Sequence, residues 1–206
     1  MGSAVFRRRD VLAGAGALIA SPVLAQTSPG VVRVALTTGQ GLITLELFSD
    51  KAPITTANFL RYVDERLYDR ATIYRALTTP GAPGTGLIQG GARFDPARPH
   101  KPIAHESTTQ TGLSHKDGTI SLARLAPGTA TSDFFICVGD APGYDADPTA
   151  PGDNLGFAAF GHVAEGMDVV RAILALPTSA TKGPPGMVGQ MLDPPVPLIT
   201  TRRVAA

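Results

Sequence analysis

The sequence has one cysteine and no tryptophan among its 206 residues. A single thiol excludes an intramolecular disulfide, so the fold must be stabilised by side-chain packing. The cysteine, Cys137, lies in the apolar run from Phe134 to Val138. In that setting we expect a buried small side chain rather than a nucleophile.

The chain also lacks an excess of charge of either sign. It has 18 lysine and arginine residues against 17 aspartate and glutamate residues, which is a formal net charge of +1. Binding of nucleic acid needs a concentrated basic surface. The composition therefore predicts no nucleic acid partner.

Motifs for metals and cofactors are missing as well. The histidines are His100, His105, His115 and His162, and their spacing matches no metal-binding motif. We expect each of them on the surface or in a loop. The glycine-rich stretch 81–91 lacks Gly-Lys-Ser/Thr, and the chain has no Gly-x-Ser-x-Gly elbow. The sequence predicts no metal and no cofactor.

No hydrophobic run is long enough for a membrane anchor. The apolar run 13–20 follows a basic start, and Ser21 to Ala25 ends in small residues, so we expect residues 1–25 to be a cleavable export signal. Arg8-Arg9 before x-Val-Leu resembles a twin-arginine signal, with an ordinary secretory signal as the alternative. Either route predicts a periplasmic or secreted protein without stable membrane insertion.

Removal of this signal leaves residues 26–206, with 15 basic and 16 acidic side chains. About 181 residues suit one domain with a sizeable core rather than two. We therefore expect a single domain. No apolar surface stripe is evident, so we expect a monomer.

Short strand patterns make up most of the remaining chain. Residues 31–36 and 42–47 are β-rich, and the second run alternates apolar and polar side chains, so we expect a hairpin turning at Gly39–Gly41. Further strands are expected at 72–74, 87–89, 119–122, 134–138, 158–163 and 196–202. Between them lie connections rich in glycine and proline, notably 79–86, 141–156 and 181–195.

Two helices are expected among these strands. Pro53 fits the first turn of one helix, and Ile54, Ala57, Leu60, Val63 and Leu67 recur at helical spacing as an apolar stripe. The second helix is expected from Met167 to Leu176, before Pro177. Many short strands with two helices predict a mainly β protein, and the pattern alone permits a closed antiparallel barrel or a sandwich.

Seven segments resemble signatures of the cyclophilin family of peptidyl-prolyl cis-trans isomerases, in the same order and at compatible spacing. They are Ala52-Pro53, Asn58-Phe59, Tyr74-Arg75, Ile88–Gly91, Gly118–Ala123, Phe134–Ile136, and Phe160–Val163 with Gly166–Val169. The resemblance implies a closed antiparallel eight-stranded barrel capped by two α-helices. Arg124, after Ala123, is similar to exported bacterial members, where many eukaryotic members have asparagine.

The resemblance also implies a reaction and three catalytic residues. Rotation about an X-Pro bond has a barrier near ~20 kcal/mol, and it is accelerated by binding the twisted amide more tightly than the planar forms. Arg75 would donate a hydrogen bond to the prolyl nitrogen or a neighbouring carbonyl. Gln89 would hold the substrate carbonyl, and Phe135 would form the floor of the proline pocket. The implied partners are proline-containing polypeptides.

Further residues would bind substrate in the same family pattern. Leu87 and Phe157 would lie beside Phe135, while Phe134 would point into the core. Ala123 and Arg124 would pair with the substrate backbone as an added edge. Tyr144 lies near the position of an aromatic wall in the family.

Three features depart from the family pattern. Residues 78–85 lengthen the connection between Arg75 and Gln89, and Gly86 stands where the family has a pocket phenylalanine. The missing ring would leave one wall open unless the inserted loop folds back over it. Asp133 replaces a glutamine, and an ion pair with Arg75 would either hold or occupy the guanidinium.

Three functions remain open at this point. The first is an exported prolyl isomerase, and the second is a non-catalytic or weakly active peptide-binding chaperone on the same fold. An Arg75 side chain that is free toward a groove favours the first, and a closed pair with Asp133 favours the second. The third is an unrelated secreted barrel with a deep interior cavity for a small ligand.

Overall fold

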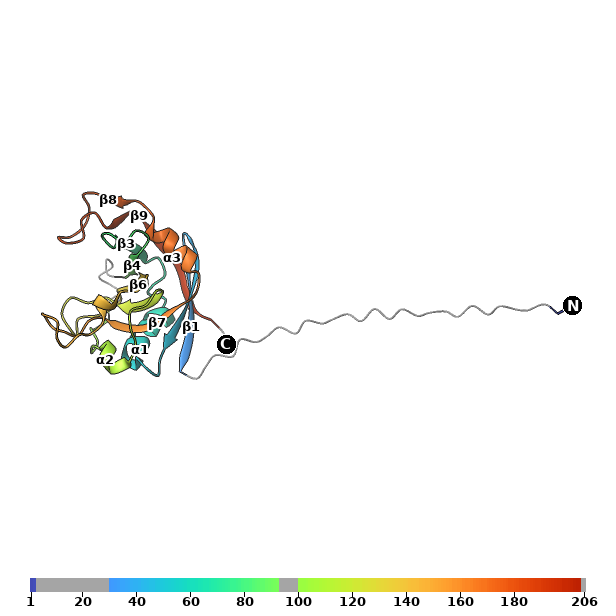
Figure 1. The fold of residues 1–206 in the computed structure, drawn as a ribbon, viewed down its shortest axis with the longest axis horizontal. Helices are drawn as coiled ribbons and strands as arrows, with labels where there is room; N and C mark the ends of the chain where they lie inside the picture. Colours follow the sequence, from blue (N-terminus) through green and yellow to red (C-terminus); the bar gives the residue numbers. More distant parts are fainter. Residues whose placement is uncertain (3–29, 93–99, 205–206) are drawn as a thin grey trace.

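The computed structural model describes residues 1–2, 30–92 and 100–204 (Figure 1). The expected export signal, residues 1–25, lies outside the described residues apart from the first two. None of the helices in the described ranges is long and apolar enough to cross a membrane. The described part of the expected domain 26–206 is built around one sheet.

Eight antiparallel strands of this sheet close into a barrel. They follow one another in the order β1, β2, β7, β5, β6, β4, β3 and β9, and β9 pairs with β1 to complete the ring. A ninth strand, β8, pairs with β9 at the edge. The strands are β1 (Val31–Thr38), β2 (Gly41–Phe48), β3 (Thr72–Thr78), β4 (Gly86–Gly91), β5 (Thr119–Leu122), β6 (Phe134–Val138), β7 (Ala158–Glu165), β8 (Thr178–Ser179) and β9 (Met191–Arg203). The predicted eight-stranded barrel is therefore confirmed.

The predicted first hairpin is present, with Val34 opposite Leu45. Alternation in β2 places Ile43, Leu45 and Leu47 in the core, each with no exposed surface. On the outer face Glu46 accepts a hydrogen bond from Arg33 at 3.0 Å. The period-two pattern therefore identified the buried face of this strand correctly.

Helix α1 (Pro53–Asp64) forms where a helix was expected, but its buried face differs from the prediction. Ile54 is 44% exposed and Ala57 is exposed, whereas Phe59 and Tyr62 are fully buried. The carboxylate of Glu106 accepts hydrogen bonds from the amides of the first turn and fixes how the helix meets the barrel. The predicted apolar stripe is therefore wrong at its first two positions, and its last residue, Leu67, lies beyond the end of the helix.

The described residues form three α-helices rather than the two expected. Helix α2 (Thr108–Thr111) is a single turn without apolar periodicity, held by a capping box between Ser107 and Gln110. Helix α3 (Met167–Leu174) begins as predicted and ends two residues early. Helices α1 and α3 lie toward opposite ends of the barrel, as Figure 1 shows.

Apolar side chains fill the inside of the barrel. Phe59 contacts Phe134 with ring centroids 5.6 Å apart and Phe160 at 5.3 Å. Phe134 is thus a core residue, as predicted. A filled interior is incompatible with the third hypothesis, the barrel with a deep ligand cavity.

Alternation along β6 places a second, smaller apolar cluster outside the barrel. Phe135 and Cys137 belong to this cluster together with Leu87 of β4. Cys137 has no exposed surface, and burial raises the pKa of its thiol to about 12. It is a buried apolar side chain, as predicted, and the outer cluster marks the face where the site lies.

Candidate active site

Strand register brings the three expected catalytic residues into one row. Arg75 of β3 pairs with Gln89 of β4, and Gln89 pairs with Phe135 of β6. The register of β3 shifts between Ile73 and Arg75, so Tyr74 is an extra residue at this point. Such an irregularity changes the face to which the following side chain points. Arg75 is half-buried on the outer face, whereas Ile73 is fully buried in the core.

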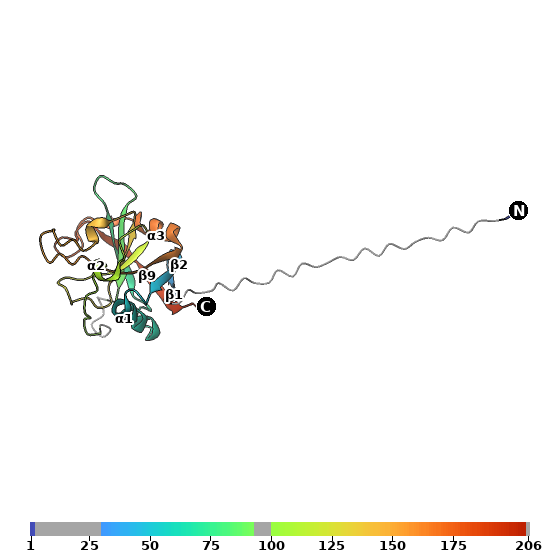
Figure 2. The same cartoon turned by 60° about the horizontal axis from the view of Figure 1, so that its bottom comes forward.

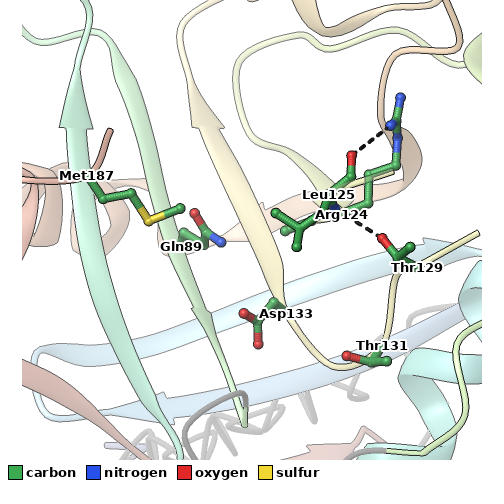
Figure 3. Close-up of a pocket in the computed structure, with 8 residues that line it drawn as sticks. Gln89, Arg124, Leu125, Thr129, Thr131, Asp133 and Met187 are labelled. Carbon is green, nitrogen blue, oxygen red and sulfur yellow. Dashed lines mark hydrogen bonds between the residues drawn. The ribbon is translucent and has the colours of Figure 1, made fainter. Parts of the chain in front are cut away.

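A cavity of about 260 Å³ lies over this row. Eight of the nine expected site residues line it, and Met187, which was not expected, also lines it. The lining residues are Arg75, Leu87, Gln89, Ala123, Arg124, Phe135, Tyr144, Phe157 and Met187. The ninth, Asp133, lines a neighbouring cavity of about 190 Å³ that shares Gln89, Ala123, Arg124 and Met187 with the first (Figure 3).

Three aromatic rings form the apolar part of the larger cavity. Phe135 meets Tyr144 edge-on at 5.5 Å between centroids and Phe157 at 5.3 Å. Tyr144 and Phe157 meet each other at 5.6 Å, nearly at right angles. Tyr144 ends a short 3-10 helix, Pro142–Tyr144, and its carbonyl accepts from the Phe157 amide at 2.9 Å. The three rings form an apolar recess suited to a proline ring, which has no N–H to satisfy.

The Arg75 guanidinium is held by two amide oxygens. Nη1 donates to Gln89 Oε1 and Nε donates to Gln190 Oε1, each at 2.8 Å. Burial lowers the pKa of Arg75 from its usual value, and Tyr144 and Tyr74 partly oppose that effect. An arginine in a protein nevertheless stays protonated near neutral pH. The cation therefore remains a fixed hydrogen-bond donor at the cavity.

Asp133 is connected to Arg75 only through other side chains. The Tyr74 hydroxyl donates to Asp133 Oδ2 at 2.7 Å, and Gln89 Nε2 donates to the Tyr74 oxygen at 2.9 Å. Gln89 in turn accepts from Arg75. Across residues 30–92 and 100–204, no ion pair joins Arg75 to Asp133. The possible Arg75–Asp133 pair is not formed, because Tyr74 and Gln89 lie between the two groups in the network.

The Arg124 side chain supports the wall of the site rather than the groove. Its guanidinium binds both carboxylate oxygens of Asp153, at 2.7 and 2.8 Å, and Nε donates to the Gly156 carbonyl at 2.9 Å. It also lies over the Phe157 ring, 5.4 Å from the centroid. This pairing lowers the pKa of Asp153 to about 2. Figure 3 shows the Arg124 side chain leading away from Gln89 and Asp133.

Backbone geometry explains the glycine at position 86. Its φ is +149°, and an added Cβ would lie 1.9 Å from the Leu77 carbonyl oxygen. No side chain can therefore project into the cavity from here. The 78–85 insertion extends the β3–β4 hairpin, with the Thr79 amide donating to the Thr85 carbonyl, and it projects from the barrel in Figure 2. The inserted loop does not line the cavity, and Met187 lies there instead.

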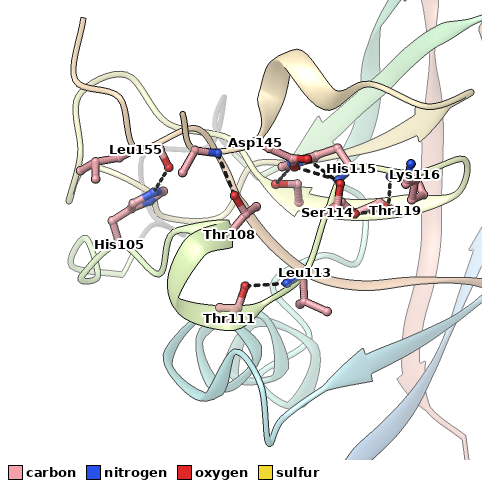
Figure 4. A network of polar contacts seen from close by, with 12 residues as sticks. His105, Thr108, Thr111, Leu113, Ser114, His115, Lys116, Thr119, Asp145 and Leu155 are labelled. Carbon is pink, nitrogen blue, oxygen red and sulfur yellow. Dashed lines mark hydrogen bonds and ion pairs between the residues drawn. The ribbon is translucent and has the colours of Figure 1, made fainter. Parts of the chain in front are cut away.

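His115 contradicts the expectation of a surface or loop histidine. It has no exposed surface and stacks on Phe135 with an angle of 11° between the rings. Nδ1 lies 2.6 Å from Asp145 Oδ1 (Figure 4). Nε2 lies 2.9 Å from Ser121 Oγ. Burial lowers the pKa of His115, although Asp145 opposes this effect. Ser121 is also fully buried, so the Asp-His-Ser series cannot reach a substrate as a hydrolase would require.

The buried neutral His115 predicts a pH dependence of stability. An unfolded histidine has a pKa near ~6.5, whereas the folded pKa is lower, so the unfolded state takes up a proton first as the pH falls. The contribution of His115 to the free energy of unfolding is present above pH ~6.5 and is lost as the pH decreases toward the folded pKa. We expect the free energy of unfolding in urea to decrease between pH 7.5 and 5. His115→Gln should have a clearly smaller slope, and equal slopes in both proteins would contradict the assignment.

Sequence reasoning missed Met187, Gln190 and His115. The first two lie in the 181–195 connection, where no periodicity indicates which side chains turn toward Arg75. Within the described ranges, no three His, Cys, Asp or Glu side chains gather in a way that could hold a metal ion.

Comparisons with known proteins find related sequences over most of the chain. The model of the family described as cyclophilin type peptidyl-prolyl cis-trans isomerase/CLD matches residues 33–189. A peptidyl-prolyl cis-trans isomerase of Acinetobacter baylyi is 34% identical over 200 residues, which is 95% of each chain. Peptidyl-prolyl cis-trans isomerase B of Escherichia coli is 36% identical over 149 residues, covering 68% of this chain and 83% of its own.

A solved structure shares the fold. The crystal structure of a cyclophilin type isomerase from Cryptosporidium parvum has a TM-score of 0.67 at 18% identity, covering 85% of this chain and 99% of that one. With the matched family model and the bacterial relatives, these findings show that the chain belongs to the cyclophilin-type peptidyl-prolyl cis-trans isomerases.

Proposed function

We propose that this isomerase is exported and accelerates rotation about X-Pro bonds in polypeptides that fold outside the cytoplasmic membrane. The observation that carries the proposal is the convergence of Arg75, Gln89 and Phe135 on one cavity. The sequence features of residues 1–25 support export. We take the mature chain to act as a monomer.

Arg75 would act on the amide while it is twisted. Rotation removes resonance from the C–N bond, so the prolyl nitrogen gains a lone pair that accepts a hydrogen bond. A donor already aimed at that position stabilises the twisted amide more than the planar forms, and this lowers the barrier. No proton is transferred, and the guanidinium is suited to this because it stays protonated.

The surrounding residues would hold the two sides of the bond. The proline ring would enter the recess of Phe135, Tyr144 and Phe157. Gln89 uses one amide N–H for Tyr74, so its second N–H can bind a substrate carbonyl. In the described part of the chain, no hydrogen bond involves the Ala123 carbonyl or the Arg124 amide. Both groups can therefore pair with the substrate backbone as an added strand.

The geometry of Arg75 favours an enzyme over a binding module. The binding-module hypothesis expects a guanidinium closed onto Asp133. Instead, Arg75 lines the cavity and is held by the amides of Gln89 and Gln190. Both amides are neutral and leave its charge available to a substrate.

One experiment tests export and activity together. The full chain with a C-terminal tag is produced in a bacterial host, and the protein recovered from the periplasm is sequenced from its N-terminus. We expect it to begin at Gln26 and to accelerate cis-trans exchange of an Ala-Pro peptide in NMR exchange spectroscopy. Retention of the whole chain in the cytoplasm would overturn export, and chemical-shift changes without acceleration would favour the binding module. Arg8→Lys with Arg9→Lys should block export if the route is the twin-arginine one.

A further inference from the structure

We propose that residues 183–190, here called the wall segment, form one side of the substrate groove. In this proposal Met187 closes the cavity where Gly86 has no side chain, and Gln190 is a positioning residue for the Arg75 guanidinium. The inference rests on the proposed function, because it concerns the same groove. It assigns a substrate contact and a positioning role to a segment between β8 and β9 for which the sequence predicted only a connection.

The wall segment is held by its own turns and by its neighbours. The Met187 amide donates to the Pro184 carbonyl at 2.9 Å, and the Gln190 amide donates to the Met187 carbonyl at 3.1 Å. The Thr178 hydroxyl of β8 donates to the Gly189 carbonyl at 2.8 Å. The Ala76 amide donates to the Gln190 carbonyl at 2.9 Å, which ties the segment to β3 beside Arg75. These contacts give the segment a defined position relative to the catalytic strand.

Met187 lines two neighbouring cavities. It lines the aromatic cavity that contains Phe135 and the neighbouring cavity that contains Asp133. Figure 3 shows its thioether extending toward Gln89. Position 86 cannot supply a wall, because a Cβ there would overlap the Leu77 carbonyl. A flexible, unbranched thioether is well suited to fill such an irregular gap.

The two cavities that Met187 lines differ in their chemistry. One is the aromatic recess, and the other is lined by Asp133, Thr129 and Thr131. An apolar side chain that lines both cavities would contact the bound peptide equally in the cis, trans and twisted forms of the X-Pro bond. We therefore expect Met187 to contribute to affinity rather than to the rate of rotation.

Gln190 acts on Arg75 and not on the substrate. Its Oε1 accepts from Nε, while Gln89 accepts from Nη1, so two of the five N–H groups are used and the guanidinium plane is fixed at two points. Gln190 Nε2 donates in turn to the Gly186 carbonyl at 3.3 Å, which orients the amide. A guanidinium that is already oriented loses less freedom when it meets the twisted amide. We therefore expect Gln190 to affect the rate of rotation.

The test separates these two roles by their kinetics. Exchange of an Ala-Pro peptide is measured by NMR over a range of peptide concentrations. Met187→Ala should raise KM about tenfold and leave kcat nearly unchanged. Tenfold is the lower end of the effect expected for the loss of an apolar contact, because the Met187 side chain is partly exposed. Met187→Leu should stay close to the wild type. Gln190→Ala should lower kcat by roughly tenfold with little change in KM. Gln190→Glu keeps an acceptor for Nε but places a carboxylate on the guanidinium and loses the donor to the Gly186 carbonyl, so it should recover little of kcat.

Val188→Ala is the matched control, because Val188 lies in the same segment, is 49% exposed and does not line either cavity. If the wild type is active but Met187→Ala and Gln190→Ala have the same KM and kcat as Val188→Ala, the roles proposed for the wall segment are wrong. The proposed function would still stand.

Two readouts do not depend on turnover. The Kd of the peptide from chemical shifts should rise in Met187→Ala. The Arg75 Nε–H signal should be protected from solvent exchange in the wild type and lose that protection in Gln190→Ala. If neither the Kd nor the Nε–H signal changes, the roles proposed for Met187 and Gln190 are wrong, even if the wild type does not catalyse. If both readouts change as expected but the wild type does not catalyse, the proposed function is wrong and the roles of the wall segment stand.

Discussion

Replacement of Arg75 with alanine is expected to lower kcat/KM for exchange of an Ala-Pro peptide by about 100- to 1,000-fold, the usual effect of removing one fixed donor from a transition-state site. Among the described residues, the cations that line the aromatic cavity are Arg75 and Arg124, and the Arg124 guanidinium is bound to Asp153. In the described part of the site, no other side chain can take over as a charged donor to the prolyl nitrogen. NMR exchange spectroscopy measures the loss directly.

Two controls accompany Arg75→Ala. Arg171→Ala removes a half-exposed arginine that pairs with Asp117 at 2.6 Å, outside both cavities, and it should leave kcat/KM unchanged. Arg75→Lys keeps the charge but loses the planar fork that donates to Gln89 and Gln190 together, so most of the activity should still be lost. Near-normal activity in Arg75→Ala would refute the donor role.

Gly86→Phe, which restores the ring seen at this place in the family pattern, is expected to destabilise the protein by more than about 3 kcal/mol. The cause is steric, because the Cβ alone would lie 1.9 Å from the Leu77 carbonyl oxygen and φ is +149°. The free energy of unfolding from urea titration is the measurement. If Gly86→Phe does not fold, Gly86→Ala should show the same clash without the added bulk of the ring, because it introduces the Cβ alone.

Gly84→Phe is the matched control for this prediction. Gly84 lies in the same hairpin, also with a positive φ of +77°, but an added Cβ there meets nothing within 4 Å. Its cost should be limited to the left-handed backbone, about 1 to 2 kcal/mol. Equal stability of Gly86→Phe and Gly84→Phe would show that the hairpin can shift to accept a side chain at position 86. Met187 would then not be needed in place of that side chain.

The strands and the catalytic row could be predicted because their signals are local or repeat in a fixed order. Alternation of apolar and polar residues identified β2, and the apolar run 134–138 identified β6. The core position of Phe134 beside the outward Phe135 follows from a period of two. The motif around Tyr74-Arg75 and the Gln89 segment lie on paired strands, so their side chains meet once the hairpin forms.

Other features depend on contacts that local pattern does not encode. The stripe predicted for α1 was wrong at Ile54 and Ala57, because the carboxylate of Glu106 fixes the first turn from outside the helix. His115 was expected in a loop or on the surface, yet Asp145 and Ser121 bind both of its ring nitrogens in the interior. In each case the deciding partner comes from another part of the fold.

The amino-acid sequence by itself determined a mainly β protein and the faces of its strands, because side-chain alternation survives in any correct pairing of the strands. The choice of a barrel over a sandwich, and the place of Arg75, Gln89 and Phe135 in one site, followed from the family resemblance that the order of the motifs carries. Only the tertiary structure decided what surrounds Arg75. Gln190, 115 residues further along the chain, reaches Nε because β9 returns to pair with β3, and Tyr74 with Gln89 keeps Asp133 from a direct ion pair. These contacts depend on long-range strand pairing, which sets distances that sequence spacing alone does not contain.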